Sequence, residues 1–100
     1  MNKYTILTNE EIVKALVTLP GWDFNDNHIF ATFEFSNFKV AYSFMTHVAF
    51  ECEVLNHHPE LTNTYNKVSF SLTTHSADNK VTSLDIKLAG LINSTAKKFG

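Results

Sequence analysis

The sequence feature that most limits the fold of this chain is a long stripe of apolar residues at helical spacing, between Ser36 and Pro59. Ser36 is a residue type that caps helices, and Pro59 disfavours helical geometry at His58. The pattern therefore predicts one helix of about 20 residues. We expect its stripe, Phe38 and Met45 included, to face the core. The stripe consists of Phe38, Ala41, Tyr42, Met45, Val48, Ala49, Cys52 and Leu55.

Two further helices are expected, one towards each end of the chain. The first should run from about Thr8 to Leu19, because Thr8 is a suitable N-cap and Pro20-Gly21 stops a helix. The last should run from about Thr82 to Lys98, where Thr82 and Asp85 have the spacing of a capping box. The apolar residues that should be buried are Ile12, Leu16 and Leu19 in the first helix and Leu84, Leu88, Leu91, Ile92 and Ala96 in the last.

Alternating apolar and polar residues predict the strands. Residues 21–35 resemble a β-hairpin with its turn at residues 25–27, and residues 64–75 are expected to have strand character, with Val68, Phe70 and Leu72 on one face. A short extended piece at residues 60–63 would be the fourth strand. The resulting order is α-β-β-α-β-β-α. It predicts one α+β domain over residues 1–100, with antiparallel strands on one side and helices on the other.

Composition excludes several functional classes. The formal net charge is −2, so nothing in the overall charge favours nucleic acid or an anionic membrane as a partner. Apolar runs are far shorter than the ~20 residues that cross a bilayer, and the first residues do not form a signal peptide. Cys52 is the only cysteine, so no internal disulfide can form. These features together predict a cytoplasmic protein that binds neither nucleic acid nor membrane.

The histidines are the residues most suited to chemistry, and His57 and His58 lie side by side at the expected end of the long helix. If the helix reaches His57, Glu53 is its i−4 neighbour and would orient that ring and favour its charged form. His58 would then point about 100° away around the helix axis. His75 lies just past strand residues Thr73 and Thr74, on the face opposite Val68, Phe70 and Leu72. For His28 and His47 we expect a plain surface or boundary position.

Three interpretations of these histidines remain open from the residues alone. Together with Glu53, His57, His58 and His75 could form an acid–base site in one cleft. Adjacent histidines and a distant cysteine lack the usual zinc spacing, but His75 and Glu53 could complete a metal site. The histidines could also be ordinary polar residues.

A longer pattern resembles a known family. Glu53, the triplet His57-His58-Pro59, Tyr65, His75 and Asp85 follow one another with three, five, nine and nine residues between them. This arrangement is similar to the signature of the pterin-4a-carbinolamine dehydratases. The similarity covers roughly 80 residues and includes the segments "GW", "FKVAYSFMTHVA" and "LDIKLAG".

The resemblance implies a fold, a reaction and a way of assembling. The fold is a four-stranded antiparallel sheet with three helices packed on one face. The reaction removes water from a pterin, 4a-hydroxytetrahydropterin, to give quinonoid dihydropterin, which recycles the cofactor of aromatic amino acid hydroxylases. It implies no cofactor and no metal. Family members form dimers or tetramers, so a homo-oligomer is expected.

The resemblance also implies the site residues. His57 and His75 would be the main acid–base pair, with His58 assisting or binding the pterin, and Glu53 would set the charge of His57. Asp85 would chiefly cap the last helix. Two positions depart from the family pattern: Leu61 stands where some members carry tryptophan, and Asn56 replaces a common aspartate. The residues implied to contact substrate are Glu53, Asn56, His57, His58, Thr73, Thr74, His75 and Ser76.

A second function is also compatible with the resemblance. Some family members are non-catalytic protein-binding modules that stabilise a partner's dimer or assist assembly. Because a purely binding protein has no need for His57, His58, His75 and Glu53 together, their presence favours the enzyme.

Overall fold

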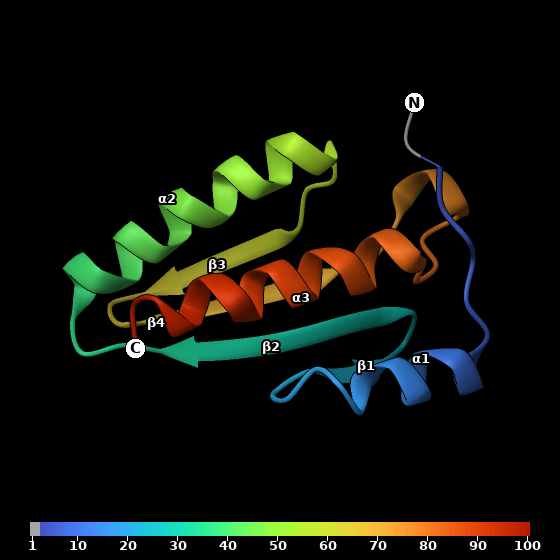
Figure 1. Cartoon of the computed structure of the whole chain (residues 1–100), viewed down its shortest axis with the longest axis horizontal. Helices are drawn as coiled ribbons and strands as arrows, with labels where there is room; N and C mark the ends of the chain where they lie inside the picture. The colour runs from blue at the N-terminus through green and yellow to red at the C-terminus, as the bar shows by residue number, and fades with distance from the viewer. Residues whose placement is uncertain (1–2) are drawn as a thin grey trace.

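A computed structural model describes residues 3–100 and has the predicted order of elements (Figure 1). The strands form one antiparallel sheet in the order β1-β2-β4-β3. In Figure 1 the helices lie on one side of the sheet, with α2 and α3 side by side and α1 beside β1. The elements are α1 (Asn9–Leu16), β1 (Asp23–Asn25), β2 (His28–Glu34), α2 (Phe38–Leu55), β3 (Glu60–Thr64), β4 (Lys67–Leu72), the 3-10 turn η1 (His75–Ala77) and α3 (Ser83–Lys97).

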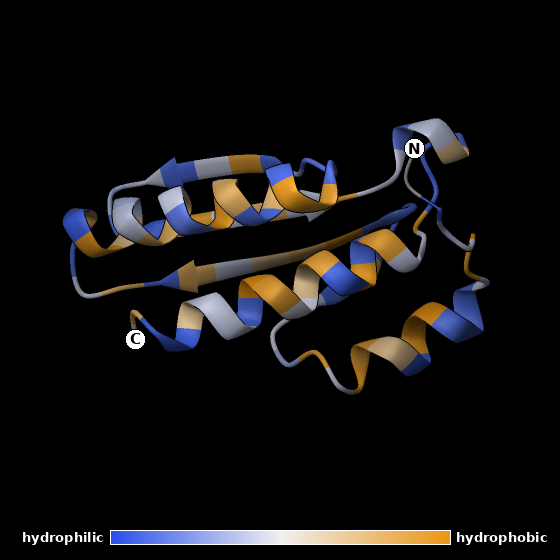
Figure 2. Ribbon diagram, turned by 45° about the horizontal axis from the view of Figure 1, so that its top comes forward, coloured by the Kyte–Doolittle hydropathy of each residue, from blue (hydrophilic) through white to orange (hydrophobic). Residues whose placement is uncertain are grey.

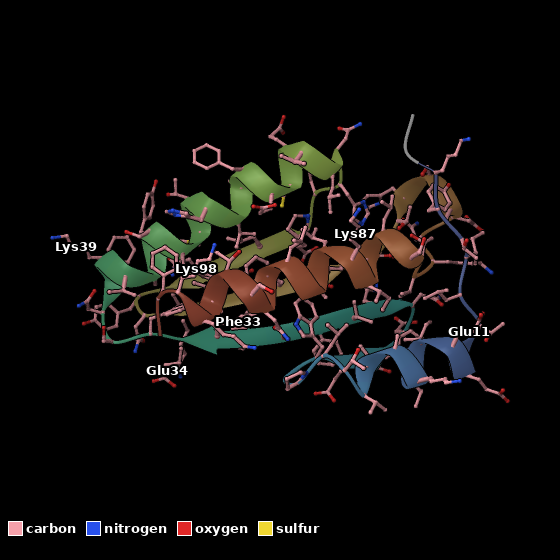
Figure 3. The ribbon with its side chains drawn as sticks, in the orientation of Figure 1. Glu11, Phe33, Glu34, Lys39, Lys87 and Lys98 are labelled. Carbon is pink, nitrogen blue, oxygen red and sulfur yellow. The ribbon has the colours of Figure 1, made fainter. Side chains whose placement is uncertain are left out.

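The hydrophobic core lies between the sheet and the helices. Strand β4 places Val68, Phe70 and Leu72 on the core side, as its alternation predicted, and Ile29 and Ala31 of β2 lie there too. Apolar and polar residues alternate around α2 and α3 in Figure 2, which is typical of helices with one buried side. Charged side chains such as Glu34 and Lys39 lie at the periphery in Figure 3.

The long helix α2 was predicted correctly in extent but only partly in orientation. Its N-cap is Asn37, not Ser36, because the Asn37 side chain accepts a hydrogen bond from the Val40 N–H at 2.9 Å. Phe38 is exposed, so its expected core position is wrong, whereas Phe44 is fully buried. Periodicity could not separate the two because α2 carries apolar residues on both sides. Buried α2 residues are Ala41, Phe44, Val48 and Cys52, and Tyr42 and Ala49 of the predicted stripe are exposed.

The other two helices begin where their capping residues predicted. Thr8 and Glu11 form a full capping box on α1, and Thr82 and Asp85 form one on α3. Helix α1 ends at Leu16, earlier than predicted, since the next three residues form tighter turns. The predicted fourth strand exists as β3. None of the helices in residues 3–100 is long and apolar enough to span a membrane.

The segments that surround the end of α2 come from distant parts of the sequence. After β4 the chain turns through η1 and returns, with the Thr74 N–H bonded to the Lys80 carbonyl at 3.0 Å. The N-terminal segment crosses this return, because the Leu7 N–H donates to the Val81 carbonyl at 3.1 Å. Residues from the N-terminus, the end of α2 and the β4–α3 connection therefore meet in one place.

Candidate active site

The end of α2 separates the two neighbouring histidines. Asn56 is the C-cap in a left-handed conformation, with φ of 50°, which asparagine adopts more readily than most residues. The next N–H, of His57, returns to the Cys52 carbonyl at 3.0 Å. This turn buries His57, whose side chain is 9% exposed, whereas the side chain of His58 is 54% exposed.

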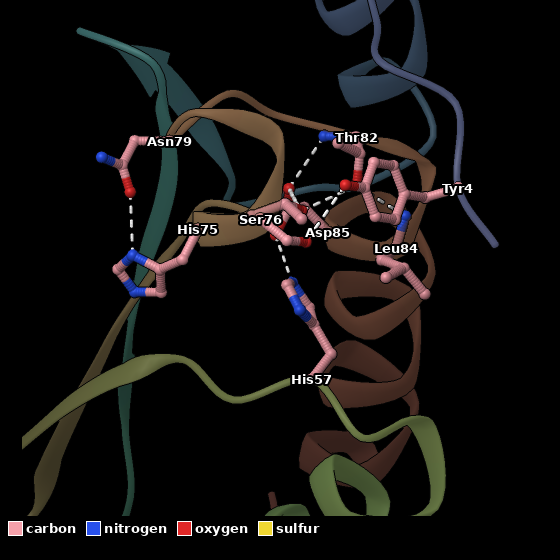
Figure 4. Close-up of polar contacts among 9 residues, drawn as sticks. Tyr4, His57, His75, Ser76, Asn79, Thr82, Leu84 and Asp85 are labelled. Carbon is pink, nitrogen blue, oxygen red and sulfur yellow. Dashed lines mark hydrogen bonds and ion pairs between the residues drawn. The ribbon is translucent and has the colours of Figure 1, made fainter. Parts of the chain in front are cut away.

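His57 is held by a buried carboxylate. Its Nε2 lies 2.5 Å from Oδ1 of Asp85, a residue with no exposed surface. The other carboxylate oxygen, Oδ2, accepts hydrogen bonds from the Thr82 N–H at 2.8 Å and the Thr74 hydroxyl at 2.9 Å. Because a carboxylate can only accept hydrogen bonds, Nε2 of His57 is the nitrogen that carries hydrogen. Figure 4 shows this network at the first turn of α3.

The expected pairing of Glu53 with His57 is wrong. Glu53 Oε1 instead lies 2.8 Å from Nε2 of His58, with both side chains exposed. The physical reason is Asn56: its left-handed backbone ends the helix before His57, so the i−4 relation with Glu53 no longer applies. Asp85 occupies the position that Glu53 was expected to take. It also caps α3 as expected, so the residue has two roles.

His75 begins η1 and is exposed. Its Nδ1 lies 2.8 Å from Oδ1 of Asn79, four residues further along the same loop, as Figure 4 shows. His28 and His47 lie elsewhere, and each contacts a nearby backbone carbonyl through Nδ1. The structure thus gathers His57, His58 and His75 in one place and leaves the other two histidines outside it.

These histidines line a cleft with a volume of about 490 Å³. Predicted site residues Asn56, Thr74 and Ser76 line it too, but Glu53 and Thr73 do not. The hydroxyl of Thr73 is buried without a hydrogen-bond partner among the described residues. The complete lining is Tyr4, Asn56, His57, His58, Thr74, His75, Ser76 and Leu84.

Two residues of the lining were missed by sequence reasoning. Tyr4 lies far from the histidines in sequence and reaches the cleft only because the N-terminal segment crosses the β4–α3 connection. Its hydroxyl lies 3.1 Å from the Ser76 hydroxyl. Leu84 was interpreted as a core residue of α3, and its place in the first turn, beside Asp85, also puts it at the cleft. No local pattern identifies either residue as part of a site.

Cys52 is a buried residue near this end of α2, and its thiol is unreactive. Burial raises the pKa of its thiol to about 11, and the nearby Glu53 carboxylate adds to the rise. Cys52 is therefore not a nucleophile at neutral pH. Within residues 3–100, no three histidine, cysteine or carboxylate side chains are close enough together to hold a metal ion.

The fold and the cleft define the class of protein: a small α+β domain whose site consists of imidazoles held by side-chain oxygens, an arrangement suited to proton transfer. Comparison identifies the family within this class. A model of the pterin 4 alpha carbinolamine dehydratase family matches residues 5–95. The chain belongs to this family, and the relatives reported below are named as dehydratases, which are hydro-lyases.

Relatives match over nearly their whole length. A provisionally named pterin-4-alpha-carbinolamine dehydratase of Prochlorococcus marinus (strain MIT 9515) is 42% identical over 93% of this chain and 96% of its own. One of Opitutus terrae is 46% identical over 85% of this chain and 88% of its own. A crystal structure titled transcriptional coactivator/pterin dehydratase from Brucella melitensis has a TM-score of 0.87 at 44% identity, covering 92% of this chain and 99% of that one.

Proposed function

We propose that this chain removes water from 4a-hydroxytetrahydropterin to give quinonoid dihydropterin, with histidines as the acid and the base. One observation carries the proposal. Each of the three cleft histidines has one ring nitrogen bound to a side-chain oxygen: His57 to Asp85, His58 to Glu53 and His75 to Asn79. The second nitrogen of each ring makes no hydrogen bond within residues 3–100. Each ring is therefore oriented, with one nitrogen left for a substrate.

The reaction requires the transfer of two protons. The bond from carbon 4a to the hydroxyl oxygen breaks, and this oxygen gains a proton and leaves as water. Nitrogen N5 loses its proton, and the electron pair of that bond forms the double bond between C4a and N5. Imidazoles can give and accept protons near neutral pH because their ordinary pKa is about 6.5. No nucleophile or redox partner is needed.

The cleft receives these groups from different elements of the fold. His57 comes from the end of α2 and His75 from the β4–α3 connection, so a pterin in the cleft could contact both imidazoles. A volume of about 490 Å³ is within the range of small-molecule sites. We assign His57 and His75 as the acid–base pair, with His58 assisting or binding the pterin. By this proposal the chain recycles the cofactor of aromatic amino acid hydroxylases in the cytoplasm.

The experiment that tests this function is stopped-flow absorbance with freshly generated 4a-hydroxytetrahydropterin. His57→Ala and His75→Ala should each lower turnover by about 10²–10⁴-fold, the usual contribution of a positioned acid or base. His47→Ala is the control, because His47 is a histidine of α2 that lies outside the cleft. Wild-type protein that does not accelerate dehydration over buffer would refute the function.

We also propose that the chain forms a homo-oligomer through the exposed side of α2, with a second copy as the partner. Phe38, Tyr42, Phe50 and Val54 recur there at multiples of four residues and are 46–79% exposed. A large exposed apolar stripe of this kind is typical of an interface.

The spacing of this stripe suits antiparallel pairing of two α2 helices about a twofold axis at Thr46. Phe38 would then meet Val54 of the second copy, and Tyr42 would meet Phe50. Lys39 would lie opposite Glu53, so the charges are complementary as well. A twofold interface requires such self-complementarity.

Sedimentation equilibrium tests this interface. Phe50→Lys should dissociate the oligomer, while Val13→Lys, at an exposed apolar position of α1, should not.

The second candidate function is a protein-binding module, because the same apolar stripe on α2 could bind a different protein. A monomeric wild type that lacks dehydratase activity and binds a stoichiometric partner through Phe50 would favour that second function.

A further inference from the structure

Asn79 lies beside a proposed catalytic histidine and fixes which ring nitrogen of His75 carries hydrogen. The Asn79 Oδ1 atom lies 2.8 Å from Nδ1 of His75. An amide oxygen can only accept a hydrogen bond, so Nδ1 is the donor. The neutral ring then has its lone pair on Nε2, which makes no hydrogen bond to the described part of the chain.

The loop backbone holds Asn79 in this place. Asp78 and Asn79 both have left-handed conformations, with φ of 60° and 57°. Such conformations are uncommon for residues other than glycine, and asparagine and aspartate adopt them most readily. The Asp78 N–H donates to the His75 carbonyl at 3.1 Å, and the Thr74 N–H donates to the Lys80 carbonyl at 3.0 Å. The turn therefore brings the side chain at position 79 back to the ring at position 75.

We propose that Asn79 is a positioning residue that holds neutral His75 with hydrogen on Nδ1, so that Nε2 exchanges the proton with substrate. The inference rests on the proposed function, in which His75 is one of the acid–base pair. Imidazole of free histidine in water prefers hydrogen on Nε2. Without an acceptor at Nδ1, most neutral rings would therefore offer the wrong nitrogen.

The two proposed catalytic rings then work through opposite nitrogens. His57 donates through Nε2 to Asp85 and leaves Nδ1 for chemistry, whereas His75 donates through Nδ1 and leaves Nε2. The titratable groups that share the cleft with His75 are His57, His58 and Tyr4, and Asp78 and Lys80 flank Asn79 in the loop. None of these is bonded to the His75 ring.

Two substitutions separate the acceptor from the shape of the loop. Asn79→Gly removes the acceptor and suits the left-handed backbone, so the loop should keep its conformation. Asn79→Asp keeps an acceptor, tolerates the same backbone and adds a negative charge beside the ring. Asp78→Asn is the matched control. It changes the neighbouring left-handed residue and leaves the Asn79 side chain bound to His75.

The first measurement is long-range ¹H–¹⁵N NMR of the histidine rings above their titration range. His75 should carry hydrogen on Nδ1 in the wild type, in Asn79→Asp and in Asp78→Asn, and should change to Nε2 in Asn79→Gly. Steady-state kinetics should show a roughly fivefold lower kcat with little change in KM for Asn79→Gly, as expected for one lost hydrogen bond. Asn79→Asp should move the His75 limb of the pH–rate profile to higher pH, because a carboxylate stabilises imidazolium.

The two measurements also distinguish this inference from the proposed function. An active wild type with hydrogen on Nε2 of His75, or an Asn79→Gly variant with unchanged tautomer and kcat, would overturn the inference alone. An inactive wild type whose His75 still changes tautomer in Asn79→Gly would overturn the proposed function and leave the role of Asn79 in setting the tautomer.

Discussion

Two histidines of the cleft are each held by a hydrogen bond from a ring nitrogen to a side-chain oxygen, but their surroundings differ. His57 is buried, and its partner Asp85 also caps α3 and bonds Thr74. His75 is exposed, and the side chain of its partner Asn79 makes no other hydrogen bond within residues 3–100. The comparison teaches that the buried histidine is part of what holds the fold together, whereas the exposed one depends on a local turn. Changes on the buried side should therefore affect stability as well as chemistry, and changes on the exposed side mainly chemistry.

The largest effect on stability is expected from Asp85→Ala. The substitution leaves the His57 ring, the Thr74 hydroxyl and the Thr82 N–H without their buried acceptor. Breaking such a buried pair costs about 3–5 kcal/mol, a large share of the stability of a small domain. Urea unfolding measures it, with Asp23→Ala on exposed β1 as the control, expected within about 0.5 kcal/mol. A loss below about 1 kcal/mol for Asp85→Ala would contradict the structural role of the buried side.

The next effect concerns Cys52, whose carbonyl accepts the His57 N–H. Burial raises the pKa of its thiol from 9.0 to about 11. The unfolded chain loses this proton near pH 9, while the folded protein keeps it. The contribution of the buried thiol to the free energy of unfolding is therefore full below pH 9 and is lost as the pH rises to 11. Two pKa units correspond to about 3 kcal/mol of folding free energy.

Urea unfolding at pH 8 and pH 11 checks this prediction. The wild type should lose more stability over this interval than Cys52→Ala, which has no thiol to titrate. The difference between the two proteins removes the effect of lysines and tyrosines, which titrate in both. Equal losses would show that the end of α2 is open to water, and the contrast between the two sides of the cleft would be weaker.

The smallest effect is expected from Glu53→Gln. Glu53 pairs with His58 while both side chains are exposed, and such pairs contribute less than about 1 kcal/mol. The thermal unfolding midpoint should shift by a few degrees at most, and turnover should fall only several-fold. A loss of activity as large as that of His57→Ala would instead support the original expectation that Glu53 controls His57.

Local sequence patterns predicted much of this fold. The capping box of Thr82 and Asp85 and the alternation of Val68, Phe70 and Leu72 depend on residues close in sequence, so the helix start and the strand face could be predicted. The orientation of α2 could not, because Phe38 and Tyr42 form a second apolar side that periodicity does not distinguish from the core side.

The sequence predicted which histidines belong to the site better than it predicted their hydrogen-bond partners. His57, His58 and His75 were identified and lie in one cleft. Their partners depend on tertiary structure: the left-handed turn at Asn56 directs His57 away from Glu53 and towards Asp85. Tyr4 reaches the cleft only through the crossing of the N-terminal segment. Asn79 approaches His75 because two left-handed residues reverse the loop.

The most direct test of the central claim is NMR of the five histidine rings during titration with a stable oxidised pterin. The claim is that the cleft at the end of α2 binds the pterin between its histidines. Ring resonances of His57, His58 and His75 should shift with a common dissociation constant, while those of His28 and His47 stay unchanged. Shifts confined to His28 or His47, or no shift at saturating pterin, would contradict the account.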